Sequence, residues 1–118
     1  MGDGTVEGTR ARSVLFGANR IAVTLPTLCE FVWVLGRIYR KPKRDIALAI
    51  RALIESDAVS FDRPAVLAGL AFLDAGGDFA DGVIAFEGRR LGGEVFVTFD
   101  KQAAKLIAAQ GNAVELLS

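Results

Sequence analysis

The chain has 118 residues, enough for one hydrophobic core but not for two, so we expect a single domain over residues 1–118 with an irregular start over 1–6. Apolar residues make up 52% of it and 14 basic residues balance 14 acidic ones, which excludes a disordered chain and any function that needs an overall basic surface. Histidine is absent and Cys29 is alone, so carboxylates must carry any metal or acid–base chemistry and no internal disulfide can form.

The first half of the chain alternates short apolar runs with helical patterns. We predict helices over residues 7–17, 26–39 and 42–55, and a strand over 21–24. Gly17 closes the first helix, Pro26 opens the second, and apolar residues surround the second helix on all sides, so it is predicted to be buried. This most apolar stretch is interrupted by Glu30 and is too short to span a bilayer. The start also lacks the features of a signal peptide, so we expect a cytoplasmic protein.

The second half repeats this alternation, with an aspartate before each helix. Strands are predicted over residues 59–61, 94–99 and 113–117, and helices from 63 to 74, 79 to 91 and 101 to 110. Asp62, Asp78 and Asp100 are placed to cap these helices, and Gly111 ends the last one. Strands separated by helices predict an α/β fold, with a parallel sheet covered on both faces.

Three acids stand in apolar surroundings and are predicted to converge. Glu30 is the only charged residue from position 21 to 36, and desolvating a carboxylate is costly unless a positive partner, such as a divalent metal, meets it. Asp81 shares a helix face with Ile84 and Ala85, which predicts an inward side chain. Asp100 follows an apolar strand, at the sheet edge where ligands gather, although it can equally be a helix cap.

Clustered carboxylates repel one another unless they share a hard cation, and Mg²⁺ or Mn²⁺ is the natural candidate for oxygen ligands. With a nucleic-acid substrate, such an ion would orient or ionise the attacking water and neutralise charge on the phosphorus centre. The acids therefore predict phosphodiester hydrolysis.

A basic cluster lies at the predicted turn between the second and third helices, and it consists of Arg37, Arg40, Lys41, Lys43 and Arg44. These cations could contact RNA phosphates, but the preferred interpretation is a solvated turn with cations favourably placed at a helix C-terminus. The aromatic residues Phe31, Trp33 and Phe96 are predicted to be core residues and not base-stacking platforms, and Cys29 a small buried hydrophobe.

Three segments together resemble the PIN domain, and most closely the VapC-like ribonuclease toxins: PTLCEFVWVL, GGDFADGVIA and VTFDKQAAKL. The resemblance implies a three-layer α/β/α fold with a parallel sheet, a Mg²⁺ or Mn²⁺ site and endonucleolytic cleavage of RNA. It also implies a homodimer that a cognate antitoxin inhibits. By position, Glu30, Asp81 and Asp100 match the metal-site acids of the family, with Asp78 and Thr98 as supporting residues.

One departure from the family concerns the start. The family opens with an apolar central strand that ends in Asp followed by Thr or Ser and Asn, and no such strand precedes residue 9 here. Residues 1–8 hold only Val6 as a candidate β residue, and no apolar strand would hold Asp3 or Glu7 in place of the lost acid. Either the reading frame starts upstream of Met1, or the chain is an N-terminally truncated relative whose sheet must adjust.

The leading hypothesis from sequence is thus a metal-dependent endoribonuclease of the toxin–antitoxin type. The alternative is a catalytically impaired PIN remnant that binds a protein such as the antitoxin. A nuclease acting on DNA flaps is a more distant option, because the chain is short for it. A phosphate-receiver domain does not fit the direct sequence Asp100-Lys101.

Overall fold

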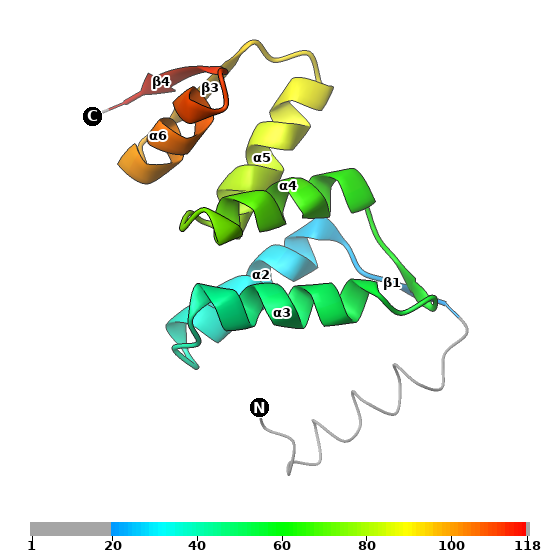
Figure 1. The fold of residues 1–118 in the computed structure, drawn as a ribbon. Helices are drawn as coiled ribbons and strands as arrows, with labels where there is room; N and C mark the ends of the chain where they lie inside the picture. The colour runs from blue at the N-terminus through cyan, green and yellow to red at the C-terminus, as the bar shows by residue number, and fades with distance from the viewer. Residues whose placement is uncertain (1–19, 118) are drawn as a thin grey trace.

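The computed structural model describes residues 20–117, which form a mixed α/β unit (Figure 1). The described part contains five helices and two pairs of short parallel strands. The expectations for residues 1–6, for the helix over 7–17 with Gly17, and for Asp3 and Glu7 lie outside the described residues. None of the described helices has the length and apolar character needed to cross a membrane.

The first four described elements follow the predicted order. They are β1 (Ile21–Ala22), α2 (Leu25–Arg37), α3 (Lys43–Ile54) and β2 (Val59–Ser60). Pro26 lies in the first turn of α2, as predicted, because its missing N–H leaves no donor unpaired there. The expectation that α2 is buried all round is wrong, since only Leu28, Val32 and Leu35 are buried. One stripe of α2 packs inward and the rest faces solvent.

The second half also has the predicted order. Its elements are α4 (Arg63–Asp74), α5 (Phe79–Arg90), β3 (Val95–Thr98), α6 (Lys101–Ala109) and β4 (Ala113–Leu116). Asp62, Asp78 and Asp100 are the N-caps of α4, α5 and α6, and each accepts at least one hydrogen bond from a backbone N–H of the first turn. Gly111, with φ of 80°, ends α6 in the left-handed region that favours glycine.

The strands form two separate sheets. β1 pairs with β2 through Ile21↔Val59 and Ala22↔Ser60, and β3 pairs with β4 from Val95↔Ala113 to Thr98↔Leu116. Both pairs are parallel, as predicted, but the expected single sheet covered on both faces is not formed within residues 20–117. Figure 1 shows β3, β4 and α6 at one end and β1 at the other, with α4 and α5 between them. Val95 and Val97 of β3 are exposed, so one face of that pair is uncovered.

The core lies between the helices. Its main cluster combines buried residues of α2, α3, α4 and α5, among them Leu28, Ile50, Leu70 and Phe79. A smaller cluster of Phe72, Ala85 and Ile107 joins α6 and the β3–β4 pair to α4 and α5. Both clusters meet at α4 and α5, so this helix pair holds the two ends of the fold together.

Helices α4 and α5 approach closely because glycines stand at their crossing. A Cβ added to Gly82 would lie 2.5 Å from the carbonyl oxygen of Ala68 and 2.9 Å from Cα of Gly69. A Cβ added to Gly69 would lie 2.6 Å from the ring of Phe79. At Gly82 a side chain would meet the backbone of α4 and move the helices apart, whereas at Gly69 the side chains of Phe79 and Val83 would have to shift.

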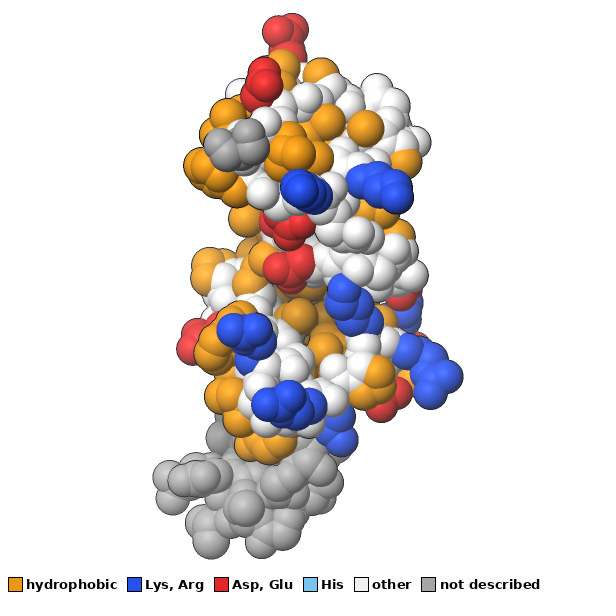
Figure 2. Space-filling model, turned by 90° about the vertical axis from the view of Figure 1, so that its left-hand side faces the viewer, with side chains coloured by type: hydrophobic (Ala, Val, Ile, Leu, Met, Phe, Trp, Pro, Cys, Tyr) orange, Lys and Arg blue, Asp and Glu red, His pale blue; other side chains and the backbone are white. Residues whose placement is uncertain are grey.

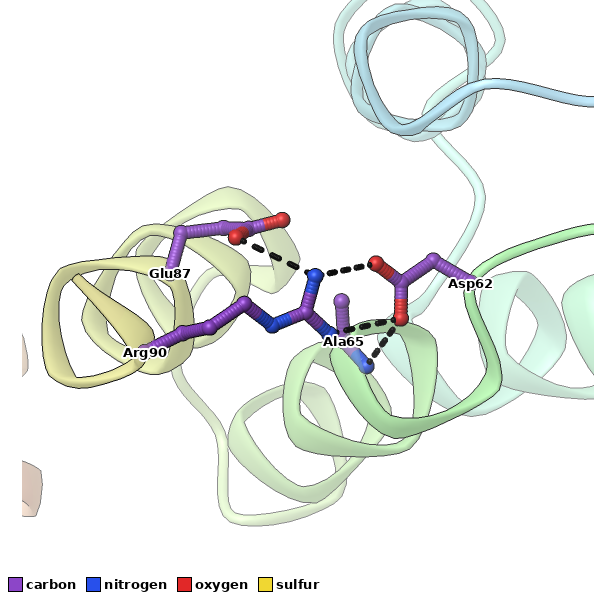
Figure 3. A network of polar contacts seen from close by, with 4 residues as sticks. All are labelled: Asp62, Ala65, Glu87 and Arg90. Carbon is purple, nitrogen blue, oxygen red and sulfur yellow. Dashed lines mark hydrogen bonds and ion pairs between the residues drawn. The ribbon is translucent and has the colours of Figure 1, made fainter.

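A polar network also links the N-terminus of α4 to the C-terminal turn of α5 (Figure 3). Arg90, in the last turn of α5, donates from Nη1 to Asp62 Oδ2 at 2.8 Å and from Nη2 to Oδ1 at 3.0 Å. Glu87 lies 3.6 Å from the same guanidinium. Hydrogen bonding to Arg90 lowers the pKa of Asp62, and the bond that Ala65 donates to this carboxylate acts in the same direction. One carboxylate therefore caps α4 and holds the end of α5.

Candidate acidic site

The candidate site lies at the N-termini of α5 and α6, where Asp78 and Asp100 are the N-caps and Asp81 lies in the first turn of α5. Asp78 accepts a hydrogen bond from the N–H of Ala80 at 3.2 Å and so caps α5. Asp81 lies one turn further along the helix and is half-buried. On its face Ala85 is buried but Ile84 is 56% exposed, so the predicted inward direction holds only in part.

Asp81 is the most perturbed acid among residues 20–117. Burial, and then the negative charges of Asp78 and Asp100, raise its pKa from 3.8 to about 6. Asp100 is nineteen positions away in the chain, yet its charge reaches Asp81 because β3 returns the chain to this place. The structure thus brings two of the three predicted ligands, Asp81 and Asp100, into one electrostatic neighbourhood.

Asp100 is fixed by the loop between β3 and α6. It accepts hydrogen bonds from the N–H groups of Gln102 at 2.8 Å and Ala103 at 3.3 Å, both at Oδ1. Its own N–H donates to the hydroxyl of Thr98 at 3.0 Å. The capping interpretation is therefore confirmed, and Thr98 supports Asp100 through its backbone. Both capping hydrogen bonds are accepted by Oδ1, so Oδ2 of Asp100 does not take part in capping. Asp100 can therefore cap α6 and bind a metal ion at the same time.

Glu30 does not behave as the sequence suggested. It is exposed on α2, so water, and not a buried positive partner, accounts for its charge. It is also not among the charges that raise the pKa of Asp81. Its neighbour Cys29 is half-buried against the main core, and burial, followed by the charge of Asp78, raises the pKa of that thiol. The turn of α2 that carries Glu30 is therefore near the α5 N-terminus.

The described residues do not complete a closed metal centre. Within residues 20–117, no three Asp, Glu or Cys side chains lie close enough to hold one ion together. The donor chemistry still suits a hard cation, because Mg²⁺ commonly takes one or two carboxylates and fills its other positions with water and phosphate oxygens. Asp81 and Asp100, beside Asp78, would provide that smaller set of ligands.

The predicted basic cluster is exposed at the turn between α2 and α3. Arg37 lies in the last turn of α2, where a cation is favourable, and Arg40 adopts φ of 53° in the turn. Lys43 donates from Nζ to the carbonyl oxygen of Gly76, before α5. On the face drawn in Figure 2, acidic side chains lie near the middle of the molecule, with Lys and Arg side chains above and below them.

One aromatic residue differs from its prediction. Phe31 and Phe96 pack against the two core clusters, as expected, but Trp33 is 57% exposed, so its assignment to the core is wrong. The helical spacing could have predicted this exposure. Glu30, Trp33 and Arg37 are three and four positions apart, so Trp33 shares one face of the helix with two charged residues.

Comparisons with known proteins add no relative: no family model, no curated protein and no solved structure matches this chain.

Proposed function

We propose that the protein is a metal-dependent endoribonuclease of the PIN type, related to VapC-like toxins, with Asp81 and Asp100 as ligands of Mg²⁺ or Mn²⁺. The observation that carries the proposal is the raised pKa of Asp81. Burial and then the negative charges of Asp78 and Asp100 raise it to about 6. Neighbouring acids that repel one another gain most from a shared cation.

The acids would act through their arrangement at the two helix N-termini. Asp100 is held rigidly by Gln102, Ala103 and Thr98, while Asp81 is mostly ionised at neutral pH because its pKa remains below 7. A bound ion would neutralise charge on a phosphodiester and lower the pKa of a water molecule. Glu30 remains a candidate ligand on the neighbouring helix α2, and Asp78 a supporting acid. Through the bound ion, the acids of the site would orient the phosphate toward the attacking water.

The strand arrangement supports the PIN-like part of the proposal. The resemblance implies parallel strands, and both strand pairs within residues 20–117 are parallel. The protein partners that follow from the proposal are a cognate antitoxin and a second copy of the chain, and the substrate is RNA.

A second candidate function is a catalytically impaired PIN remnant that binds a protein such as the antitoxin. It is favoured by the absence of a three-ligand metal group within residues 20–117. The uncovered face of β3, with Val95 and Val97, would offer such a partner an apolar surface.

Cleavage of RNA in Mg²⁺ or Mn²⁺ separates the two candidates. The variants are Asp81→Asn, Asp100→Asn and Glu30→Gln, with Asp57→Asn as the control because Asp57 is an exposed acid outside the site. Asn caps helices about as well as Asp, so Asp100→Asn is expected to fold. We expect Asp81→Asn and Asp100→Asn to lose cleavage and Asp57→Asn to keep it. Activity unchanged by both site variants would disprove the site, and no cleavage or metal binding by the unaltered protein would favour the remnant.

A further inference from the structure

An open groove of about 500 Å³ adjoins the acidic site. It lies between the second half of α2, the start of α3 and the loop between α4 and α5. The residues that give it chemical character are one aromatic side chain, three cations and one acid: Trp33, Arg37, Lys41, Lys43 and Asp78.

The aromatic wall of the groove is exposed to solvent. Trp33 is the only tryptophan of the chain, and more than half of it is accessible to solvent. The groove wall near it also includes Val32 and Gly36. An exposed aromatic face of this kind stacks well on a nucleic-acid base, whatever the base.

The cations of the groove are held by the local backbone. Arg37 ends α2, and the N–H of Lys41 donates to the carbonyl oxygen of Leu35 at 2.9 Å, which fixes the turn beside the groove. Lys43 reaches across to Gly76. Arg40 and Arg44, the other two members of the basic cluster, do not line the groove. The structure therefore divides the cluster into cations that face the groove and cations that do not.

The far end of the groove is acidic. Asp78 lines it and is the N-cap of α5, one turn before Asp81, so the groove reaches the candidate site. A partner rich in carboxylates would meet repulsion at this end. A phosphodiester chain would meet the same repulsion only until a cation occupied the acids, which is the condition for cleavage.

We propose that this groove binds a single-stranded RNA segment, with one base stacked on Trp33 and the flanking phosphates at Arg37 and Lys41, and that it leads the chain toward Asp81. The inference rests on the proposed function, since it names the path of its substrate. Sequence preference is not required, because stacking and phosphate contacts tolerate any base.

The test measures binding without cleavage. A fluorescein-labelled oligouridylate of about 8 nucleotides is titrated into Asp81→Asn protein in EDTA, and binding is followed by anisotropy. Further substitutions in this background are Trp33→Leu, Arg37→Ala and Lys41→Ala, with Arg44→Ala as the matched control from the same cluster. We expect Trp33→Leu to weaken binding about tenfold or more. Arg37→Ala and Lys41→Ala should each lower the slope of log K against log salt by about 0.7. Arg44→Ala should change neither quantity by as much.

Quenching provides a second readout in the protein that retains tryptophan, because all of its tryptophan fluorescence comes from Trp33. RNA should quench it, and an oligoglutamate peptide should not. Equal quenching by the peptide would overturn the inference in favour of an acidic protein partner. So would a Trp33→Leu variant that binds RNA normally but changes oligomeric state in gel filtration, since Trp33 would then belong to a dimer interface.

The outcomes separate this inference from the proposed function. RNA binding that depends on Trp33, without any cleavage by the unaltered protein in Mg²⁺ or Mn²⁺, supports the groove and refutes the nuclease. Cleavage that depends on Asp81 but is unaffected by Trp33→Leu and Arg37→Ala supports the nuclease and refutes the groove.

Discussion

Replacing Asp81 by Asn should stabilise the protein at neutral pH. Folding raises the pKa of Asp81 from 3.8 to about 6, so the folded state holds this proton more tightly than the unfolded chain does. The free energy of unfolding therefore falls as the pH rises from 3.8 to about 6, and the full deficit is present above that range. Asn is nearly isosteric and uncharged, so it removes the deficit.

The magnitude follows from the two pKa values. Their difference would correspond to a loss of about 3 kcal/mol in the free energy of unfolding if the carboxylate were shielded from water. Solvent reaches part of Asp81 and screens its neighbours, so we expect about 1 kcal/mol. In a domain of this size that raises the melting temperature by about 3–5 °C.

Thermal unfolding followed by circular dichroism, at neutral pH and again below pH 3.8, measures this effect. Below 3.8 the side chain is protonated in both states, so the stabilisation by Asn should largely disappear. Asp57→Asn is the control and should show no comparable pH-dependent gain. A variant that is less stable than the original at neutral pH, or equally stabilised at both pH values, would refute the electrostatic account of Asp81.

Three further predictions concern the helices around the site. Gly82→Ala should cost about 1–3 kcal/mol or more in denaturant unfolding, because its Cβ would collide with the backbone of α4; a neutral effect would contradict the close crossing of α4 and α5. Arg90→Met should lower the melting temperature at neutral pH, and its effect should fade as the pH falls below 3.8 and Asp62 takes up a proton; a constant effect would rule out the ion pair as its cause. Cys29 should alkylate slowly at mildly alkaline pH, and Asp78→Asn should speed the reaction by lowering the pKa of the thiol; an unchanged rate would place the two groups apart.

The local elements of the fold were readable from the sequence because their signals are local. Asp62, Asp78 and Asp100 each precede a helix, and the capping hydrogen bonds they accept from backbone N–H groups are made within three residues. Gly111 likewise marks the end of α6 through its backbone conformation. A signal of this kind depends on neighbouring residues alone and needs no knowledge of the tertiary structure.

The pairing of strands and the exposure of α2 were not readable in the same way. Average hydrophobicity from residue 21 to 36 suggested burial, whereas the helical spacing of Glu30, Trp33 and Arg37 defines an exposed face. Whether two strand pairs join into one sheet depends on segments far apart in the chain, which no short motif encodes.

The candidate site shows the same division. The proximity of Asp81 and Asp100 followed from their places at the ends of a helix and a strand, because such ends gather at one side of an α/β fold. The role given to Glu30 depended on its burial, which tertiary packing decides, and that premise failed.

The most direct test of the central claim is the pKa of the Asp81 carboxyl group, measured by NMR titration with and without Mg²⁺. We predict a value of about 6 in the absence of metal and a clear fall when Mg²⁺ is added, because the cation would favour the ionised form. Asp57 should show no such response to Mg²⁺. A pKa of Asp81 near 3.8 without metal, or one that saturating Mg²⁺ leaves unchanged, would contradict the account of a shared acidic site.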